Sequence, residues 1–175
     1  MSASITDARP AHIPAIHRIY AHWVLHGLAS FEEVPPDAAE MDRRRLSVQE
    51  LKLPYLVAED GGEVLGFAYA GPYRPRSGYR FTVEDSVYVA PGTHGKGIGR
   101  RLLSEVVARA EALGRLQMLA VIGDSGNAAS IGLHAALGFR QIGTMRSVGF
   151  KFGRWVDTVI MQRALGPGDT ILPTG

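Results

Sequence analysis

The chain has 175 residues, of which 46% are hydrophobic, and this length suits one domain with a single buried core. It contains no cysteine, which excludes disulfide bonds and an acyl-enzyme intermediate on a thiol. The formal net charge is only +2, which suits small anionic ligands as readily as nucleic acid and decides neither. We predict one domain over residues 1–165 and a flexible tail over 166–175.

The composition also bears on location. No apolar run approaches the length of a membrane span, and the first residues have neither the basic start nor the apolar core of a signal peptide. The chain shows no aromatic-basic alternation and no helix-turn-helix pattern. We therefore expect a cytoplasmic protein that binds neither a membrane nor nucleic acid.

The first third of the chain predicts a strand over residues 4–8 and a helix over residues 13–25. His22 and His26 lie one turn apart in this helix, but Trp23 stands where a zinc-binding His-Glu-x-x-His sequence has glutamate. We therefore predict no metal site. Gly27 ends the helix, and a loop leads to a second predicted helix over residues 38–48.

The next segments predict a sheet. Residues 55–58 and 64–69 predict two strands joined by a hairpin turn with two glycines. A basic, aromatic loop with two prolines follows over residues 71–80, and loops of that kind usually hold ligands. The strand predicted over residues 81–89 alternates, so that Glu84, Ser86 and Tyr88 point to one face.

A glycine-rich segment, residues 94–101, separates this strand from an amphipathic helix. Its glycines allow the backbone to approach an anion, and the start of the helix directs unpaired N–H groups toward it. Lys96, Arg100 and Arg101 add positive charge. The segment therefore predicts a cradle for a pyrophosphate group.

Two familiar phosphate-binding loops do not fit the same segment. A Walker A loop requires glycine and then serine or threonine at the positions that Ala90 and Gly97 occupy. The dinucleotide-binding sequence Gly-x-Gly-x-x-Gly requires glycine at Arg100 or Leu102. What remains is Gly-x-Gly-x-Gly after a strand.

The second half of the chain predicts a buried strand over residues 119–122 and a helix over residues 128–137. Asn127 is a good N-cap for this helix, and Gly138 ends it. Asn127, Ser130 and His134 recur at three and four residues and therefore share one helix face. Residues 141–146 and 156–162 predict closing strands, so that the element order predicts a mixed sheet with helices on both faces.

These motifs resemble the GCN5-related N-acetyltransferases. Gly97 and Gly99 match the family's pyrophosphate loop, Gln/Arg-x-x-Gly-x-Gly/Ala, although His94 stands at the place of Gln or Arg. The stretch from Asn127 is similar to the family's last motif, with His134 in place of a tyrosine. The sequences Val-Glu-x-Ser-Val-Tyr-Val, Asn-Ala-Ala-Ser-Ile-Gly-Leu-His and Lys-Phe-Gly-Arg-Trp-x-Asp resemble one branch, the phosphinothricin and methionine sulfoximine N-acetyltransferases.

The resemblance implies an α/β fold with a mixed, mostly antiparallel twisted sheet. It implies direct transfer of an acetyl group from acetyl-CoA to the α-amine of a small amino acid analogue, in a ternary complex. Glu84 is implied as the base, acting directly or through a water, and His134 as a second acid or base. The residues implied for the cofactor side are Val87, Tyr88, Val89, Gly95, Lys96, Gly97, Ile98, Gly99, Arg100, Asn127 and Ser130. Those implied for the substrate side are Phe31, Arg74, Pro75, Arg76, Glu84, Asp85 and Ser86.

Other interpretations remain open. Without the resemblance, Glu84 could be a surface partner of the arginines at 74, 76 and 80, and His134 a packing group. The acceptor could be a peptide or protein N-terminus, or the chain could be a CoA-sensing module without turnover. The resemblance further implies a homodimer in which residues 151–157 lie near the partner subunit.

Overall fold

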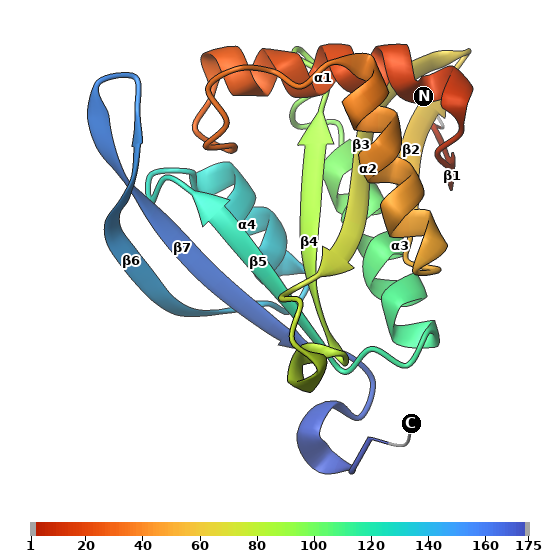
Figure 1. Cartoon of the computed structure of the whole chain (residues 1–175), viewed down its shortest axis with the longest axis vertical. Coiled ribbons are helices and arrows are strands. Elements are labelled where there is room, and N and C mark those ends of the chain that lie inside the picture. The colour runs from red at the N-terminus through yellow and green to blue at the C-terminus, as the bar shows by residue number, and fades with distance from the viewer. Residues whose placement is uncertain (1–2, 174–175) are drawn as a thin grey trace.

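Within residues 3–173, which the computed structural model describes, seven strands form one sheet in the order β1-β2-β3-β4-β5-β7-β6 (Figure 1). Residues 1, 2, 174 and 175, which belong to the predicted domain and tail, lie outside the described part. Neighbouring strands are antiparallel except for the pair β4 and β5. The predicted α/β class with a mostly antiparallel mixed sheet is confirmed. The strands are β1 (Ser4–Asp7), β2 (Tyr55–Asp60), β3 (Glu63–Pro72), β4 (Thr82–Val89), β5 (Gln117–Gly123), β6 (Arg140–Lys151) and β7 (Arg154–Ala164).

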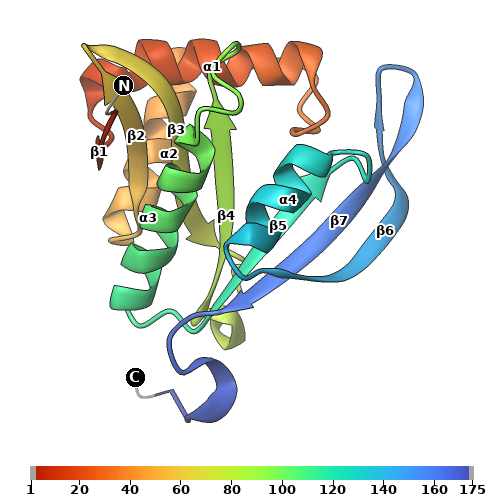
Figure 2. The ribbon, with the colours of Figure 1, turned by 180° about the vertical axis from the view of Figure 1, so that it is seen from behind.

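Helices cover both faces of the sheet. In Figure 1, α1 (Ile13–His26) and α2 (Ala38–Glu50) lie in front of it, and Figure 2 shows α3 (Ile98–Ala112) and α4 (Ala128–Ala136) on the opposite face. Each helix buries one stripe, because apolar residues that recur every three or four positions share a face. In α3 this stripe includes Leu102, Leu103 and Val106, none of which is exposed. None of the described helices is long and apolar enough to cross a membrane.

The core on the α1 and α2 face is aromatic. The rings of Tyr55 and Tyr69 stack at 4.8 Å, Phe67 stacks on Tyr88 at 5.2 Å, and Tyr20 of α1 meets Tyr88 edge-on at 5.1 Å. Fully burying a large apolar side chain stabilises a protein by about 1.5–3 kcal/mol. This cluster therefore holds α1 firmly on β3 and β4, and β4 is the strand that carries the predicted catalytic segment.

The sheet opens between β4 and β5, the feature that creates the site. Their parallel pairing runs from Thr82 opposite Gln117 to Asp85 opposite Ala120 and ends there. Beyond this point β4 stays paired with β3 as far as Val89, while β5 stays paired with β7 as far as Gly123. The two strands therefore diverge in a V, which Figure 1 shows between the labels β4 and β5.

Two segments differ from the sequence-based expectation. Strand β6 is longer than the predicted residues 141–146, because its pairing with β7 resumes after an irregular stretch near Ser147. The carboxylate of Asp157 accepts hydrogen bonds from the Ser147 N–H at 2.9 Å and from the Ser125 hydroxyl at 3.0 Å, which stabilises that irregular backbone. In the predicted tail, Gly168–Thr170 form a short 3-10 turn in which Gly168 is buried.

Candidate active site

A groove of about 400 Å³ lies between β4, the loop after it, the start of α3 and α4. The loop turns sharply because Gly95 and Gly97 adopt left-handed φ angles of 76° and 75°, which glycine reaches without strain. Gly97 is the N-cap of α3, so the first N–H groups of that helix point toward the groove. Of the residues expected on the cofactor side, the groove is lined by Val87, Tyr88, Val89, Gly95, Gly97, Ile98, Gly99, Arg100, Asn127 and Ser130.

The positive charge of the groove differs from the expectation. Arg100 lines it, but the exposed Lys96 does not. Arg101 turns away and donates a hydrogen bond to the Ala3 carbonyl at 2.5 Å, so it ties α3 to the N-terminal segment instead of adding charge to the cradle. Successive residues at a helix start point in different directions around its axis, and only one of the two arginines therefore faces the groove.

Several groove residues, notably Trp23, were not predicted from the sequence. The indole Nε1 donates a hydrogen bond to the Val89 carbonyl at 2.8 Å, and its ring meets the His94 ring edge-on at 5.5 Å. His94, which stands where the loop of the resembling family has Gln or Arg, thus lines the groove against an aromatic wall. Trp23 packs against the hydrophobic core from α1, and no spacing signal in the sequence links it to β4.

The start of α4 forms the opposite wall. The Asn127 side chain accepts a hydrogen bond from the Ser130 N–H at 3.1 Å, which confirms Asn127 as the N-cap. Asn127 and Ser130 also line a second, inner cavity of about 50 Å³ at the point where β4 and β5 separate. The two cavities share these residues together with Ala29, Val87 and Tyr88, so the groove continues into the opening of the sheet.

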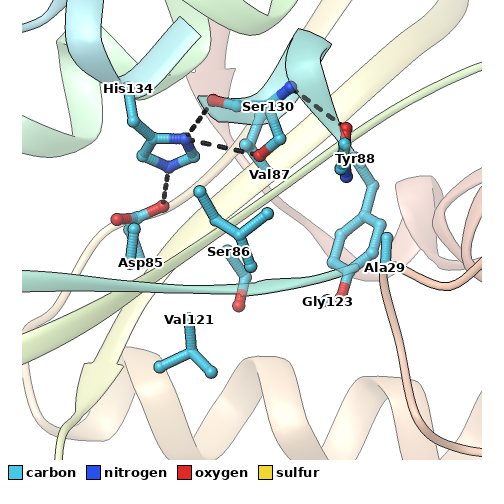
Figure 3. Close-up of a pocket in the computed structure, with 12 residues that line it drawn as sticks. Ala29, Asp85, Ser86, Val87, Tyr88, Val121, Gly123, Ser130 and His134 are labelled. Carbon is cyan, nitrogen blue, oxygen red and sulfur yellow. Dashed lines mark hydrogen bonds and ion pairs between the residues drawn. The ribbon is translucent and has the colours of Figure 1, made fainter. Parts of the chain in front are cut away.

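The inner cavity is bordered by a buried pair, Asp85 and His134 (Figure 3). The His134 Nε2 lies 3.0 Å from Asp85 Oδ1, and its Nδ1 lies 2.7 Å from the Ser130 carbonyl oxygen. Burial raises the pKa of Asp85 more than the hydrogen bond and charge of His134 lower it. Burial by itself lowers the pKa of His134, but the hydrogen bond and charge of Asp85, together with the hydrogen bond to the Ser130 carbonyl, outweigh that effect and raise the pKa. Asp85 was expected beside the substrate; its carboxylate instead binds His134 on the α4 face of the sheet.

Glu84 lies on the other face of β4, as the strand alternation predicted for Glu84, Ser86 and Tyr88. Burial raises the pKa of Glu84, and the charge of Asp85 raises it further, while Arg74 lowers it. A carboxylate with a raised pKa is a stronger base, which is the property that a proton acceptor for an ammonium group needs. The neighbouring Ser86 hydroxyl is hydrogen-bonded to Tyr69 in the aromatic core.

The loop expected to hold the acceptor is exposed. Arg74, Pro75 and Arg76 all lie in it, and the Arg74 guanidinium sits 5.1 Å from the Tyr73 ring centre. Its positive charge lowers the pKa of Glu84. Phe31 comes from the α1–α2 loop, where its ring fills the space that a side chain at Gly149 would need.

A buried lysine holds that α1–α2 loop in place. Lys151 is only 1% exposed, and its ammonium donates to the Gly27 carbonyl at 2.9 Å and the Ser30 carbonyl at 2.7 Å. Burial lowers the pKa of Lys151. Residues 151–157 were expected near a partner subunit. Within one chain, the ammonium group of Lys151 is hydrogen-bonded to the loop that carries Ala29 and Phe31. The described residues contain no cluster of three side chains suited to a metal ion.

Comparison with known proteins agrees with this geometry. The family model for acetyltransferases (GNAT) matches residues 16–139. The chain is 58% identical to a phosphinothricin N-acetyltransferase of Alcaligenes faecalis, over 98% of this chain and 87% of that protein. It is 48% identical to an L-methionine sulfoximine/L-methionine sulfone acetyltransferase of Pseudomonas aeruginosa, over 95% of this chain and 97% of that one. The crystal structure of a phosphinothricin acetyltransferase from Sinorhizobium meliloti in complex with AcCoA superimposes with a TM-score of 0.96 at 50% identity, covering 99% of this chain and 94% of that chain. On the strength of the matched motifs, the open sheet and these relatives, the chain belongs to the acetyltransferase (GNAT) family.

Proposed function

We propose that the protein transfers an acetyl group from acetyl-CoA to the α-amine of a small amino acid analogue of the phosphinothricin, methionine sulfoximine or methionine sulfone type. The observation that carries the proposal is the opening between β4 and β5, where the groove reaches the strand that bears Glu84. The names of the relatives supply the acceptor class.

The groove fits the co-substrate by its shape and donors. The glycine loop and the start of α3 offer backbone N–H groups to a pyrophosphate, with Arg100 adding positive charge. Because β4 leaves β5 after Asp85, backbone groups of residues 86–88 are available to bind an extended arm as an added strand would. Acetyl-CoA supplies the activated acetyl group at this opening.

Side chains of this protein carry out the proton transfers of the reaction. Glu84 removes a proton from the acceptor's ammonium group, directly or through a water, because only a neutral amine attacks a thioester. A backbone N–H of residues 87–89 stabilises the developing oxyanion. His134 acts from the other face of β4 as the second acid. The chain has no cysteine, which is in keeping with direct transfer in a ternary complex.

The basic loop, residues 71–80, binds the acceptor's anionic groups. Arg74 and Arg76 offer paired donors that suit a carboxylate and a phosphinate or sulfoximine group. Phe31, Pro75 and Ser86 complete the expected substrate side, whereas the carboxylate of Asp85 is occupied by His134. We further propose a cytoplasmic homodimer without nucleic-acid or membrane partners.

The test is the release of free thiol from acetyl-CoA with a panel of acceptors: L-phosphinothricin, L-methionine sulfoximine, L-methionine sulfone, free amino acids, short peptides and polyamines. We expect the highest kcat/KM with the amino acid analogues, and mass spectrometry should locate the acetyl group on the α-amine. Preferred acetylation of peptides would favour the N-terminal acetyltransferase alternative. Binding of acetyl-CoA without turnover on any acceptor would favour a CoA-sensing module.

A further inference from the structure

Both ring nitrogens of His134 face hydrogen-bond acceptors. Nδ1 lies 2.7 Å from the Ser130 carbonyl oxygen, and Nε2 lies 3.0 Å from Asp85 Oδ1 (Figure 3). A neutral imidazole carries one proton, so beside an ionised Asp85 one of its lone pairs would point at an oxygen lone pair. That repulsion disappears when the pair holds one further proton. The geometry therefore assigns a shared proton to Asp85 and His134 together.

The surroundings keep this proton in place. The two side chains are only 2% and 3% exposed, and Asp85 Oδ2 is buried without a hydrogen-bond partner among the described residues. The raised pKa values of both groups mean that the pair loses its proton at a higher pH than a free imidazole does. The elements packed around the pair contribute Ser130 and Asn127 from α4 and the Phe139 ring edge before β6. On β4, the ionisable group coupled to Asp85 is Glu84, which lies on the opposite face.

Ser130 connects the pair to the groove. Its hydroxyl oxygen lies 3.4 Å from His134 Nδ1, and Ser130 lines both the groove and the inner cavity. We propose that Asp85, His134 and Ser130 form a relay that delivers a proton to the departing thiolate of coenzyme A, with Asp85 as the positioning residue that keeps His134 charged. This role rests on the proposed acetyl transfer.

Two proton transfers accompany the departure of coenzyme A. When the carbon–sulfur bond breaks, the Ser130 hydroxyl gives its proton to the thiolate and takes the Nδ1 proton of the His134 imidazolium. Coenzyme A leaves as the thiol, Ser130 is again a hydroxyl, and His134 is neutral because it keeps its Nε2 proton, which it donates in a hydrogen bond to the ionised Asp85. The bare Nδ1 then faces the Ser130 carbonyl oxygen, which favours recovery of a proton from solvent. The acceptor amine's protons leave separately through Glu84.

A direct test follows the ring nitrogens of His134 by NMR in protein labelled with ¹⁵N-histidine. In the wild type at pH 7.5 we expect both nitrogens to be protonated, and in Asp85→Asn we expect a neutral ring, because the carboxylate that holds the charge is gone. A neutral His134 in the wild type, or an imidazolium that survives in Asp85→Asn, would overturn the proposal. This readout needs no acceptor, so it decides the state of the pair even if the proposed function fails.

Kinetics test the relay itself. With both substrates saturating, Asp85→Asn should lower kcat by about ten- to a hundredfold, and the alkaline limb of its pH profile should move to lower pH. Ser130→Ala should lower kcat while the His134 imidazolium persists, and it provides the test if Asp85→Asn does not fold. Asp42→Asn is the matched control, because it removes a carboxylate from the buried Arg45 on α2, far from the site, and should leave the pH profile unchanged.

A double-mutant cycle completes the test. The kcat of the double variant Asp85→Asn/His134→Asn should be no lower than the kcat of His134→Asn alone. The two residues act as one unit, so removing His134 already abolishes the contribution of Asp85. Independent, multiplicative losses, or an unchanged pH profile in Asp85→Asn, would show that the pair is only structural.

Discussion

At the scale of single residues, Arg74 moderates the basicity of Glu84. Its positive charge lowers the pKa of Glu84, against the larger effects of burial and of Asp85, which raise it. The base must be ionised to work, so activity falls as the pH drops through its pKa.

Arg74→Ala should therefore move the acid limb of the kcat/KM profile for the acceptor to higher pH. It should also raise the acceptor KM severalfold and leave the KM for acetyl-CoA nearly unchanged, because Arg74 does not line the groove. Arg43→Ala, at an exposed position on α2, is the control. An equal rise in both KM values would place Arg74 in the co-substrate site or in general stability.

The positions of several candidate site residues on their strands and helices were predictable from the sequence, but the hydrogen-bond partners of these residues were not. Glu84, Asn127 and the glycine loop stand where their spacing predicted. The Asp85–His134 contact joins residues 49 positions apart, and it depends on how α4 is rotated over β4, which no local pattern encodes. Likewise the burial of Lys151 depends on carbonyl groups of the distant α1–α2 loop.

At the scale of elements, the glycine loop is expected to bind acetyl-CoA mainly through its backbone. Gly97 has a left-handed φ of 75°, which a valine adopts only with strain, whereas the Lys96 side chain is exposed outside the groove. Gly97→Val should therefore raise the Kd for acetyl-CoA at least tenfold, which corresponds to a loss of about 1.4 kcal/mol of binding free energy. Lys96→Ala should raise this Kd much less. Calorimetric titration of both variants measures this, and a larger loss for Lys96→Ala would contradict the backbone account.

The docking of the α1–α2 loop on β5 depends on Gly123. A Cβ added there would lie 2.0 Å from the Leu28 carbonyl oxygen. Gly123→Ala should therefore destabilise the protein by about 1–3 kcal/mol, the usual cost of overpacking, and raise the acceptor KM by displacing Phe31.

The matched control is Gly132→Ala in α4, where an added Cβ meets nothing within 4 Å. Because alanine is the better helix former by about 1 kcal/mol, this variant should raise the melting temperature. Thermal unfolding and initial rates measure both changes. A Gly123→Ala protein as stable as the wild type would show that the loop is free to move away.

The elements themselves were predictable where apolar periodicity was regular. Helix α1 and strands β2 to β5 fall within a few residues of their predicted limits. The length of β6 was not predictable, because its pairing with β7 shifts register and many of its side chains are exposed. No alternation of buried and exposed residues therefore marks this strand in the sequence.

At the scale of the whole molecule, the β6–β7 hairpin carries an unusual number of exposed apolar side chains, namely Ile142, Met145, Val148, Phe150, Phe152 and Trp155. Clusters of this kind on a protein surface mark interaction sites. In Figure 1 the hairpin projects away from the helices, so a second subunit could cover it.

We expect the wild type to sediment as a dimer at micromolar concentration, and Trp155→Glu to sediment as a monomer, because a carboxylate buried in an apolar interface without a partner is costly. Leu172→Glu, at an exposed apolar residue far along the tail, should remain dimeric. A wild type that is monomeric at every concentration would exclude this surface as the dimer interface.

The most direct test of the account is the rate of the Glu84→Gln enzyme. This change keeps the shape of the side chain and removes its basicity. With both substrates saturating at pH 7, kcat should fall by about two to four orders of magnitude, the usual span for a lost general base, and recover in part as rising pH deprotonates the amine in solution. A Glu84→Gln enzyme that works near the wild-type rate at pH 7 would contradict the central claim and leave His134 as the better candidate base.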